Sequence, residues 1–412
     1  MSNLGIPFRI TLGGTGLALL LLAACGDSYG PNGGGDTATL SGTVRAAGAA
    51  LADATVSIGT LQATSDANGQ FKLTGVRVGA ATVRAERPGY QPAQAAVTIA
   101  AGDNRQDFAL TPQEIYTAGA NSVYVPPGVE PIRGAIIVLG GPVTAGFVTG
   151  ERLTPSTSPP ELEPSLQAMG ASLRALARSE RVALLGSRTI AMGNNASSDN
   201  ALFAALSSTA QLSGHPELAD APVLAFGLSA GCPEAAGLVA RNADRAIGLL
   251  VRVPTSVTAL TAPSALAVPA FVMQAEADAV VNNSAVRMTF QSNRSRGGRW
   301  ALAVEPGVGH SVATSLANGT VTSWIRSALA ARLPATPGGP LVALDESSGW
   351  LGSQATLEIA PWADYAGARS GASWLISESA AVSWRALGTP AAPTTDQLTA
   401  APRHSALPRR PT

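Results

Sequence analysis

A strand-like apolar run, residues 221–226, leads into the Gly-Leu-Ser-Ala-Gly string of residues 227–231 and then into an Ala-rich helical pattern at 233–241. A Gly-x-Ser-x-Gly string between a strand and a helix predicts a sharp turn that holds the serine hydroxyl clear of the sheet. Glycines are needed there because larger side chains would collide with neighbouring backbone. The following helix N-terminus favours developing negative charge. We therefore predict that Ser229 is a nucleophile.

Apolar strands and helical patterns alternate through residues 113–335, which we expect to form one domain. Fully apolar strands separated by helices predict a parallel sheet buried on both faces. In such sheets the functional site lies at the carboxyl ends of the strands. The expected strands are residues 134–139, 182–185, 221–226, 246–251, 268–274 and 300–304, and the expected helices are residues 161–179, 201–212 and 314–333.

The chain contains three histidines, and the expected sheet separates them. His215 precedes the strand that leads to Ser229, so it belongs at the opposite end of the sheet. His404 lies in a Pro/Ala-rich tail. His310 follows the last expected strand and is the one histidine placed to reach Ser229. We predict that His310 is the general base that takes the serine proton during attack.

The third member of such a site is an acid that orients the imidazole. No Asp or Glu lies between residues 246 and 275, so the strand ending near Val253 does not supply it. The next strand is followed by Glu276 and Asp278. We prefer Asp278 and keep Glu276 as the alternative.

Residues 116–333 resemble an α/β-hydrolase of the dienelactone-hydrolase or esterase type. The motifs that carry the resemblance are residues 227–231, Glu276-Ala277-Asp278 and Gly309-His310, in that order. The order nucleophile, acid, histidine is that of the α/β-hydrolases. The resemblance implies a serine hydrolase that forms an acyl-enzyme, and we expect neither a cofactor nor a metal.

The segment after the first strand of this domain departs from the His-Gly-Gly-Gly motif of lipases and esterases. It reads Leu-Gly-Gly-Pro-Val at residues 139–143, without the histidine. Pro142 has no amide hydrogen to donate. We expect the Ala230 amide to be one oxyanion donor and the Gly141 amide the second, with Val143 as the alternative.

The N-terminus has the composition of an export signal, with one arginine and then an apolar run that ends at Cys25. Residues 22–25, Leu-Ala-Ala-Cys, resemble a bacterial lipobox, which implies a signal peptide at 1–24 and lipidation of Cys25. An ordinary secretory signal is the alternative. Gly26 is not Asp, so the resemblance implies the outer membrane if the cell has one. Residues 25–36 form a Gly-rich tether.

Residues 37–112 change to short alternating runs separated by turn residues, which predicts an antiparallel β-sandwich, with a hairpin at residues 66–69. This segment resembles the carboxypeptidase regulatory-like (transthyretin-like) domain at residues 42–44, 54–56, 64–71 and 88–90. Such domains have no catalytic residues of their own. A spacer and a glycan- or protein-binding module both remain open.

The last part of the chain divides into a Trp-rich extension, residues 336–388, and a tail, residues 389–412, that we expect to be disordered. A helical pattern lies near 378–387. The aromatic side chains either pack the extension onto the hydrolase domain or form a stacking surface for substrate. They are Trp350, Trp362, Tyr365, Trp374 and Trp384.

Composition limits the partners of this chain. The formal net charge is zero, 13% of the residues are charged, and no basic patch stands out, which argues against nucleic acid as a partner.

The connection 254–267 is too short to encode a large lid. The loop 143–158 and the C-terminal extension are the remaining segments that could border the site. We expect a lipid-anchored carboxylesterase of the cell envelope that acts on exogenous esters. The alternatives are an inactive hydrolase-fold binding module and a serine peptidase or amidase.

Overall fold

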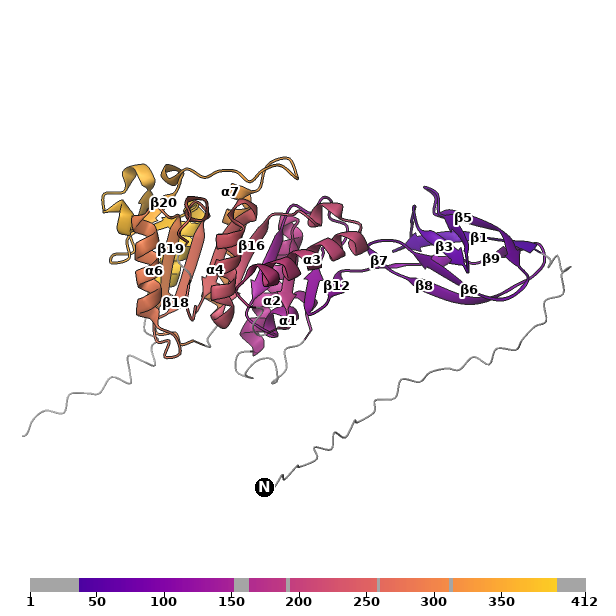
Figure 1. The fold of residues 1–412 in the computed structure, drawn as a ribbon, viewed down its shortest axis with the longest axis horizontal. Coiled ribbons are helices and arrows are strands. Elements are labelled where there is room, and N and C mark those ends of the chain that lie inside the picture. The colour runs from indigo at the N-terminus through magenta and orange to yellow at the C-terminus, as the bar shows by residue number, and fades with distance from the viewer. Residues whose placement is uncertain (1–36, 152–162, 190–192, 258–259, 311–313, 391–412) are drawn as a thin grey trace, which may run out of the picture.

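The computed structural model describes residues 37–151, 163–189, 193–257, 260–310 and 314–390. It contains an N-terminal β domain, an eight-stranded sheet flanked by helices, and a small C-terminal extension (Figure 1). The β domain lies at one end of the molecule and the extension at the other. The predicted signal peptide, Cys25, the tether and residues 391–412 lie outside the described residues. Within the described residues, no helix is both long enough and apolar enough to cross a bilayer.

The N-terminal domain consists of two packed sheets, as predicted. The alternation of the long first strand places Leu40 and Val44 in the core, where they meet Val56 and Val83 of the other sheet. One sheet is built on β1 (Thr37–Ala46), with β2 (Ala49–Ala50), β5 (Gln70–Arg77), β9 (Asp103–Arg105) and β10 (Phe108–Ala109). The other contains β3 (Thr55–Ile58), β4 (Leu61–Thr64), β6 (Gly79–Glu86) and β8 (Ala93–Ile99).

Two expectations for this domain were wrong. The sandwich is not wholly antiparallel, because the chain leaves β8, crosses to the other sheet and runs beside β1 in the same direction, as β9 and β10. The turn at residues 66–69 forms, with the Asp66 Oδ1 accepting from the Asn68 and Gln70 amides at 2.9 and 2.8 Å. However, it joins β4 and β5, which belong to different sheets, because β5 pairs along β1 instead.

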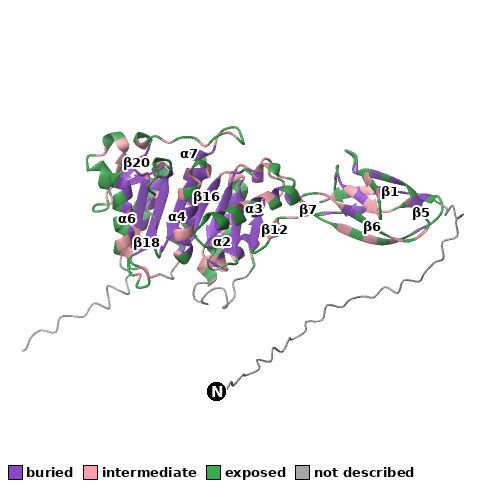
Figure 2. Cartoon of the chain, in the orientation of Figure 1, coloured by how far each residue is buried: buried purple, intermediate pink, exposed green. Residues whose placement is uncertain are grey.

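The second domain is an eight-stranded, mostly parallel sheet with the order β12-β13-β15-β14-β16-β17-β18-β19. β13 runs antiparallel to both of its neighbours, β12 and β15, and the other seven strands run in the same direction as one another. Helices cover both faces, so the central strands are buried along their length (Figure 2). The strands are β12 (Ile115–Ala118), β13 (Asn121–Tyr124), β14 (Ala135–Leu139), β15 (Ala183–Ser187), β16 (Val223–Leu228), β17 (Ala246–Arg252), β18 (Ala270–Ala275) and β19 (Trp300–Glu305).

The helices divide between the two faces of this sheet. One core contains Phe147, Leu173 and Trp324, from α1 (Val143–Thr149), α2 (Glu163–Glu180) and α7 (Ser315–Arg332). The other face is covered by α3 (Ala196–Ser213), α4 (Cys232–Arg241), the short α5 (Pro263–Leu266) and α6 (Asn283–Ser295). This is the α/β-hydrolase architecture that the sequence predicts, with α1 in part of the segment that we expected to be a loop.

The C-terminal extension packs on the edge strand β19. Trp374 and Trp384 are 2% and 1% exposed, and the Trp384 Nε1 donates to the Leu302 carbonyl at 2.5 Å. The Leu302 amide donates to Ser373 Oγ at 2.9 Å. Side chains thus satisfy this edge, on which no further strand pairs within the described residues. The packing interpretation therefore holds for these two tryptophans. The extension contains β20 (Trp350–Gly352), β21 (Ile359–Pro361), β22 (Ser373–Leu375) and α8 (Glu378–Gly388).

The β domain contacts the amino end of the large sheet. The Gly89 amide donates to the Leu212 carbonyl at 3.0 Å, and a Cβ on Gly214 would lie 3.3 Å from Pro88. The Pro-Gly-Tyr segment 88–90 leads into the short pair β7 (Tyr90–Gln91) and β11 (Thr111–Pro112). Residues 88–89 of the β domain thus pack against the last turn of α3. This contact lies at the opposite end of the sheet from the residues that follow β16 and β19.

Candidate active site

The turn after β16 has the strained geometry of a nucleophile position. Ser229 has φ +48°, a left-handed conformation that is uncommon for any residue other than glycine. It opens a 3-10 turn, Ser229–Gly231, that continues into α4. The serine is therefore held between the carboxyl end of a buried strand and the start of a helix, as the sequence predicts.

The two glycines of the string are required by close backbone contacts. A Cβ on Gly227 would lie 2.6 Å from the Cys232 Cα. A Cβ on Gly231 would lie 2.2 Å from the Leu139 carbonyl oxygen at the end of β14. Neither contact is tolerable for a side chain, so the sharp turn and its approach to the neighbouring strand depend on glycine at both positions.

The structure brings the three predicted residues Ser229, His310 and Asp278 into one hydrogen-bonded chain. Ser229 Oγ and His310 Nε2 are 2.8 Å apart, and His310 Nδ1 and Asp278 Oδ2 are 2.7 Å apart. His310 keeps its imidazole 15% exposed, whereas the Asp278 side chain is fully buried. This geometry allows His310 to accept the serine proton while Asp278 fixes the ring orientation.

Backbone groups hold the Asp278 carboxylate in place. Its Oδ1 accepts from the Val280 and Val281 amides at 2.9 and 3.2 Å, which leaves Oδ2 directed at His310. Glu276, the alternative acid, lies in the same turn but is exposed, and its Oε2 accepts from the Gly307 amide at 2.9 Å. Of the two predicted candidates, Asp278 is therefore the one that contacts the imidazole.

The predicted oxyanion segment passes directly beside the nucleophile turn. Gly140 and Gly141 have φ +157° and +86°, and a Cβ on Gly140 would lie 2.8 Å from the Leu228 Cβ. The Gly141 carbonyl accepts from the Thr144 amide and hydroxyl at 3.0 and 2.9 Å, which orients this peptide at the start of α1. The Gly141 and Val143 amides both stay candidates for the second donor beside Ala230.

The other described histidine lies where the sequence placed it, away from Ser229. His215 Nδ1 is 3.1 Å from Glu217 Oε1, and the same carboxylate oxygen accepts from the Ile132 amide at 2.8 Å. This group lies beside Gly214, near the β domain. His404 lies outside the described residues.

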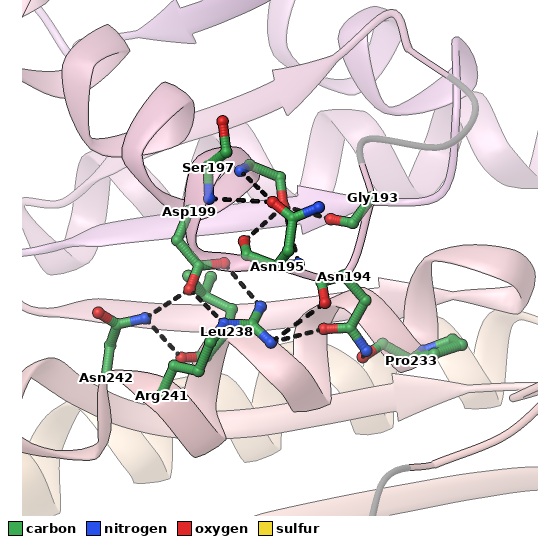
Figure 3. Close-up of polar contacts among 10 residues, drawn as sticks. Gly193, Asn194, Asn195, Ser197, Asp199, Pro233, Leu238, Arg241 and Asn242 are labelled. Atoms are coloured by element: carbon green, nitrogen blue, oxygen red, sulfur yellow. Dashed lines mark hydrogen bonds and ion pairs between the residues drawn. The ribbon is translucent and has the colours of Figure 1, made fainter.

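A polar network that sequence reasoning missed joins the segment before α3 to α4, the helix that follows the nucleophile turn (Figure 3). Asp199 is 5% exposed and binds Arg241 through two hydrogen bonds, Nε to Oδ2 at 2.7 Å and Nη2 to Oδ1 at 2.8 Å. Arg241 Nη1 also donates to Asn194 Oδ1 at 2.8 Å, and Asn194 Nδ2 donates to the Pro233 carbonyl at 3.0 Å. The network fixes the first and last turns of α4.

The sequence did contain a signal for this region. Asn195 caps α3 by accepting from the Ser197 and Ser198 amides, and an asparagine before a helical pattern is a common N-cap. The capping residue explains why α3 begins at Ala196, five residues before the predicted start.

Two buried charged residues lie at the carboxyl ends of the strands near the site. Arg252 ends β17 and Glu305 ends β19, and they are 5% and 6% exposed. Burial lowers the pKa of Arg252, and the negative charge of Glu305 opposes that shift. Cys232 is also buried, and burial raises the pKa of its thiol. Such a thiol is unreactive, so it gives no competing nucleophile beside Ser229.

Among known proteins, a family model matches the first domain, whereas solved structures match the second domain at low sequence identity. The carboxypeptidase regulatory-like domain family matches residues 39–111. No curated protein matches the sequence of the chain. The chain thus carries an N-terminal carboxypeptidase regulatory-like domain followed by an α/β-hydrolase-like region.

Several solved structures are similar to parts of the chain at low identity. A chain of a cohesin–X-dockerin complex from Acetivibrio cellulolyticus is 22% identical, with a TM-score of 0.17, over 19% of this chain and 59% of that one, which is less than two thirds of its length. A protein of unknown function from Agrobacterium tumefaciens is 16% identical over 55% of this chain and 100% of that one, with a TM-score of 0.37.

An esterase from Pyrobaculum calidifontis is 16% identical over 51% of this chain and 80% of that one, with a TM-score of 0.35. Because these TM-scores are low, the fold assignment rests on the sheet order and on the strand–turn–helix at Ser229.

Proposed function

We propose that this protein is a carboxylesterase in which Ser229 is the nucleophile, His310 the general base and Asp278 the residue that orients the imidazole. The observation that supports this most strongly is the chain of two hydrogen bonds, 2.8 and 2.7 Å long, from Ser229 through His310 to Asp278. The strained φ of Ser229 supports the same role, because strain of this kind collects at functional positions.

In the first half of the proposed reaction, Ser229 Oγ forms a bond to the ester carbonyl carbon while His310 Nε2 takes the hydroxyl proton. The carbonyl oxygen becomes an oxyanion, which accepts from the Ala230 amide and from either Gly141 or Val143. The tetrahedral intermediate then expels the alcohol, which leaves with the proton from His310, and the acyl group stays on Ser229.

In the second half, a water molecule gives a proton to His310 and bonds to the acyl carbon. Collapse of this second intermediate returns the proton to Ser229 and releases the carboxylic acid. Throughout both halves, Asp278 orients His310 and stabilises its imidazolium form.

Esters are the proposed substrates, rather than amides, because the sequence contains no paired-glutamate motif of the kind that anchors a peptide amino group. In the connection between β17 and β18, the described residues contain one helix, the four-residue α5. A short connection there is consistent with bulky esters reaching Ser229 without interfacial activation.

The test compares hydrolysis of a p-nitrophenyl ester with that of the matching p-nitroanilide. We expect the wild-type protein to hydrolyse the ester and Ser229→Ala to lose this activity. Faster turnover of the anilide would make the protein an amidase. Ester hydrolysis that survives in Ser229→Ala would remove Ser229 from the proposal.

We also propose that the protein is anchored in the cell envelope by a lipid on Cys25, which makes the membrane a partner. The lipobox-like residues 22–25 support this. Metabolic labelling with an alkyne fatty acid is expected to tag the wild type and not Cys25→Ser. Equal labelling of the two would exclude the anchor.

A further inference from the structure

The turn that carries Asp278 and the loop that carries His310 are joined by hydrogen bonds beyond the end of the sheet. We call residues 276–278 the acid turn and the described residues 306–310 the base loop. The Glu276 amide donates to the Glu305 carbonyl at 2.9 Å, and the Ala277 amide donates to the Val308 carbonyl at 2.9 Å. The pairing of β18 with β19 thus continues into both segments.

The side chain of Glu276 adds a third connection between them. Its Oε2 accepts from the Gly307 amide at 2.9 Å, three residues before His310. Gly307 has φ +66°, so this is the position at which the base loop turns away from β19. The carboxylate that sequence reasoning kept as an alternative acid is therefore bonded to the loop that carries the histidine.

The side chain of Glu305 holds the other side of the base loop. The Glu305 carboxylate accepts a hydrogen bond from the hydroxyl of Thr314. Thr314 is also the N-cap of α7, because its hydroxyl oxygen accepts from the Ala317 amide at 3.0 Å. Thr314 is the first described residue after His310, and it is thus bonded to the residue that precedes the base loop. Burying a carboxylate is costly unless it is hydrogen-bonded or paired, and here the Thr314 hydroxyl and the positive charge of Arg252 offset that cost for Glu305.

We propose that Glu276 and Glu305 are positioning residues that hold the acid turn and the base loop as one unit, although neither contacts Ser229. This inference rests on the proposed function. Its physical basis is that proton transfer from Ser229 requires the 2.8 Å distance to His310, and a displacement of about 1 Å can cost about 10²-fold in rate.

The test uses pairs of substitutions that remove or keep the hydrogen-bonding group. Glu276→Ala removes the acceptor of the Gly307 amide, whereas Glu276→Gln keeps an acceptor oxygen. Thr314→Val removes the donor to Glu305, whereas Thr314→Ser keeps it. We test the bond between Thr314 and Glu305 by substituting Thr314, because substituting Glu305 would also remove a negative charge near buried Arg252.

Two rates are measured for each variant, kcat for a p-nitrophenyl ester and the rate at which a fluorophosphonate labels Ser229. We expect Glu276→Ala and Thr314→Val to lower both by about tenfold with KM within about twofold of wild type, since the remaining hydrogen bonds limit the displacement. Glu276→Gln and Thr314→Ser are expected to keep most of the activity.

Matched controls separate positioning from stability. Ser377 caps α8 in the extension as Thr314 caps α7, accepting from the Ala380 amide at 3.1 Å. Ser377→Ala is expected to lower Tm in the manner of Thr314→Val and to leave kcat and labelling unchanged. Glu180→Gln, which loses an ion pair with Arg326, is the control for removal of a glutamate charge.

The outcomes distinguish this inference from the proposed function. If the wild type is not labelled at Ser229, both are overturned. If the wild type is labelled and Glu276→Ala and Thr314→Val are labelled at the same rate, only the positioning role is overturned. Equal losses in the Ala and Gln variants of Glu276 would also overturn it, because the charge and not the acceptor would then matter.

Discussion

The described part of the chain contains two histidine–carboxylate pairs that have similar local chemistry and different surroundings. His310 Nδ1 lies 2.7 Å from Asp278 Oδ2, and His215 Nδ1 lies 3.1 Å from Glu217 Oε1. Both imidazoles are mostly buried, 15% and 12% exposed. At the carboxyl end of the sheet, the second nitrogen of His310 faces the hydroxyl of Ser229. At the amino end, Glu217 is shared with the Ile132 amide.

The difference shows that a histidine–carboxylate pair does not identify a catalytic site. Two features distinguish the pair at the carboxyl end. The second nitrogen of His310 contacts a serine with a strained backbone, and a helix begins directly after that serine. The pair at the amino end lies beside the last turn of α3, against which residues 88–89 of the β domain pack. We therefore propose a catalytic role for the first pair and a structural role for the second.

The largest expected effect comes from removing the serine or the histidine at the carboxyl end. Ser229→Ala and His310→Ala should lower kcat for a p-nitrophenyl ester by up to about 10⁶-fold, the scale known for a serine-protease nucleophile and base. His215→Ala should stay within about twofold of wild type. Steady-state kinetics check both, and a comparable loss in His215→Ala would end the distinction between the pairs.

The next effect distinguishes the two carboxylates. Asp278→Asn should keep the fold and lower kcat by about 10⁴-fold, because an amide favours the wrong imidazole tautomer. Glu217→Gln should leave kcat within about twofold of wild type. Circular dichroism verifies folding and kinetics give kcat. If Glu276→Gln lost more activity than Asp278→Asn, the orienting role would move to Glu276.

A smaller effect is expected at the edge strand β19, on which the extension packs. Trp384→Phe removes one of three side-chain donors to the Leu302 carbonyl, since Gln354 Nε2 and Ser373 Oγ also donate to it at 2.7 and 3.1 Å. The carbonyl keeps partners, so the free energy of unfolding should fall by about 0.5–1.5 kcal/mol. Urea unfolding measures this change. Short and bulky esters should be affected alike, and a selective loss of kcat/KM for the bulky ester would instead indicate a substrate surface on the extension.

The smallest effect is a pH dependence of stability at the amino end. Burial raises the pKa of Glu217, but the Ile132 amide, its own amide and His215 lower it more, so the net shift is below the ordinary value of 4.5. Glu217 therefore stabilises the fold above that value, and this contribution is lost as pH falls through the folded-state pKa.

The measurement compares Tm of the wild type and Glu217→Gln at about pH 7 and about pH 3. We expect the difference between the two proteins to be larger at about pH 7. A difference that grows as the pH falls would contradict the sign of the shift.

Most of the large sheet was predictable because its strands are continuous apolar runs separated by helical patterns, which is typical of a parallel sheet buried on both faces. The sequence analysis missed two strands of this sheet, β12 and β13. β13 has two polar residues, Asn121 and Ser122, within four positions, so its burial becomes evident only from its pairing with β15. α6 was missed for a similar reason, since its composition is polar and only Val286 and Phe290 mark its inner face.

The candidate site was largely predictable, because the order of Ser229, Asp278 and His310 follows from the order of the strands. What the sequence did not reveal are contacts between distant segments. The bond from Gly307 to Glu276 and the network of Asp199 with Arg241 join residues 31 and 42 positions apart, and no local pattern encodes either. The crossover of β9 and β10 to β1 escaped prediction for the same reason.

The most direct test of the account is to label the purified protein with a fluorophosphonate and locate the adduct by mass spectrometry. We predict one adduct, on Ser229, that is absent from Ser229→Ala and formed far more slowly in His310→Ala. An adduct on another residue, or ester hydrolysis without any adduct on Ser229, would contradict the claim that the serine after β16 is the nucleophile.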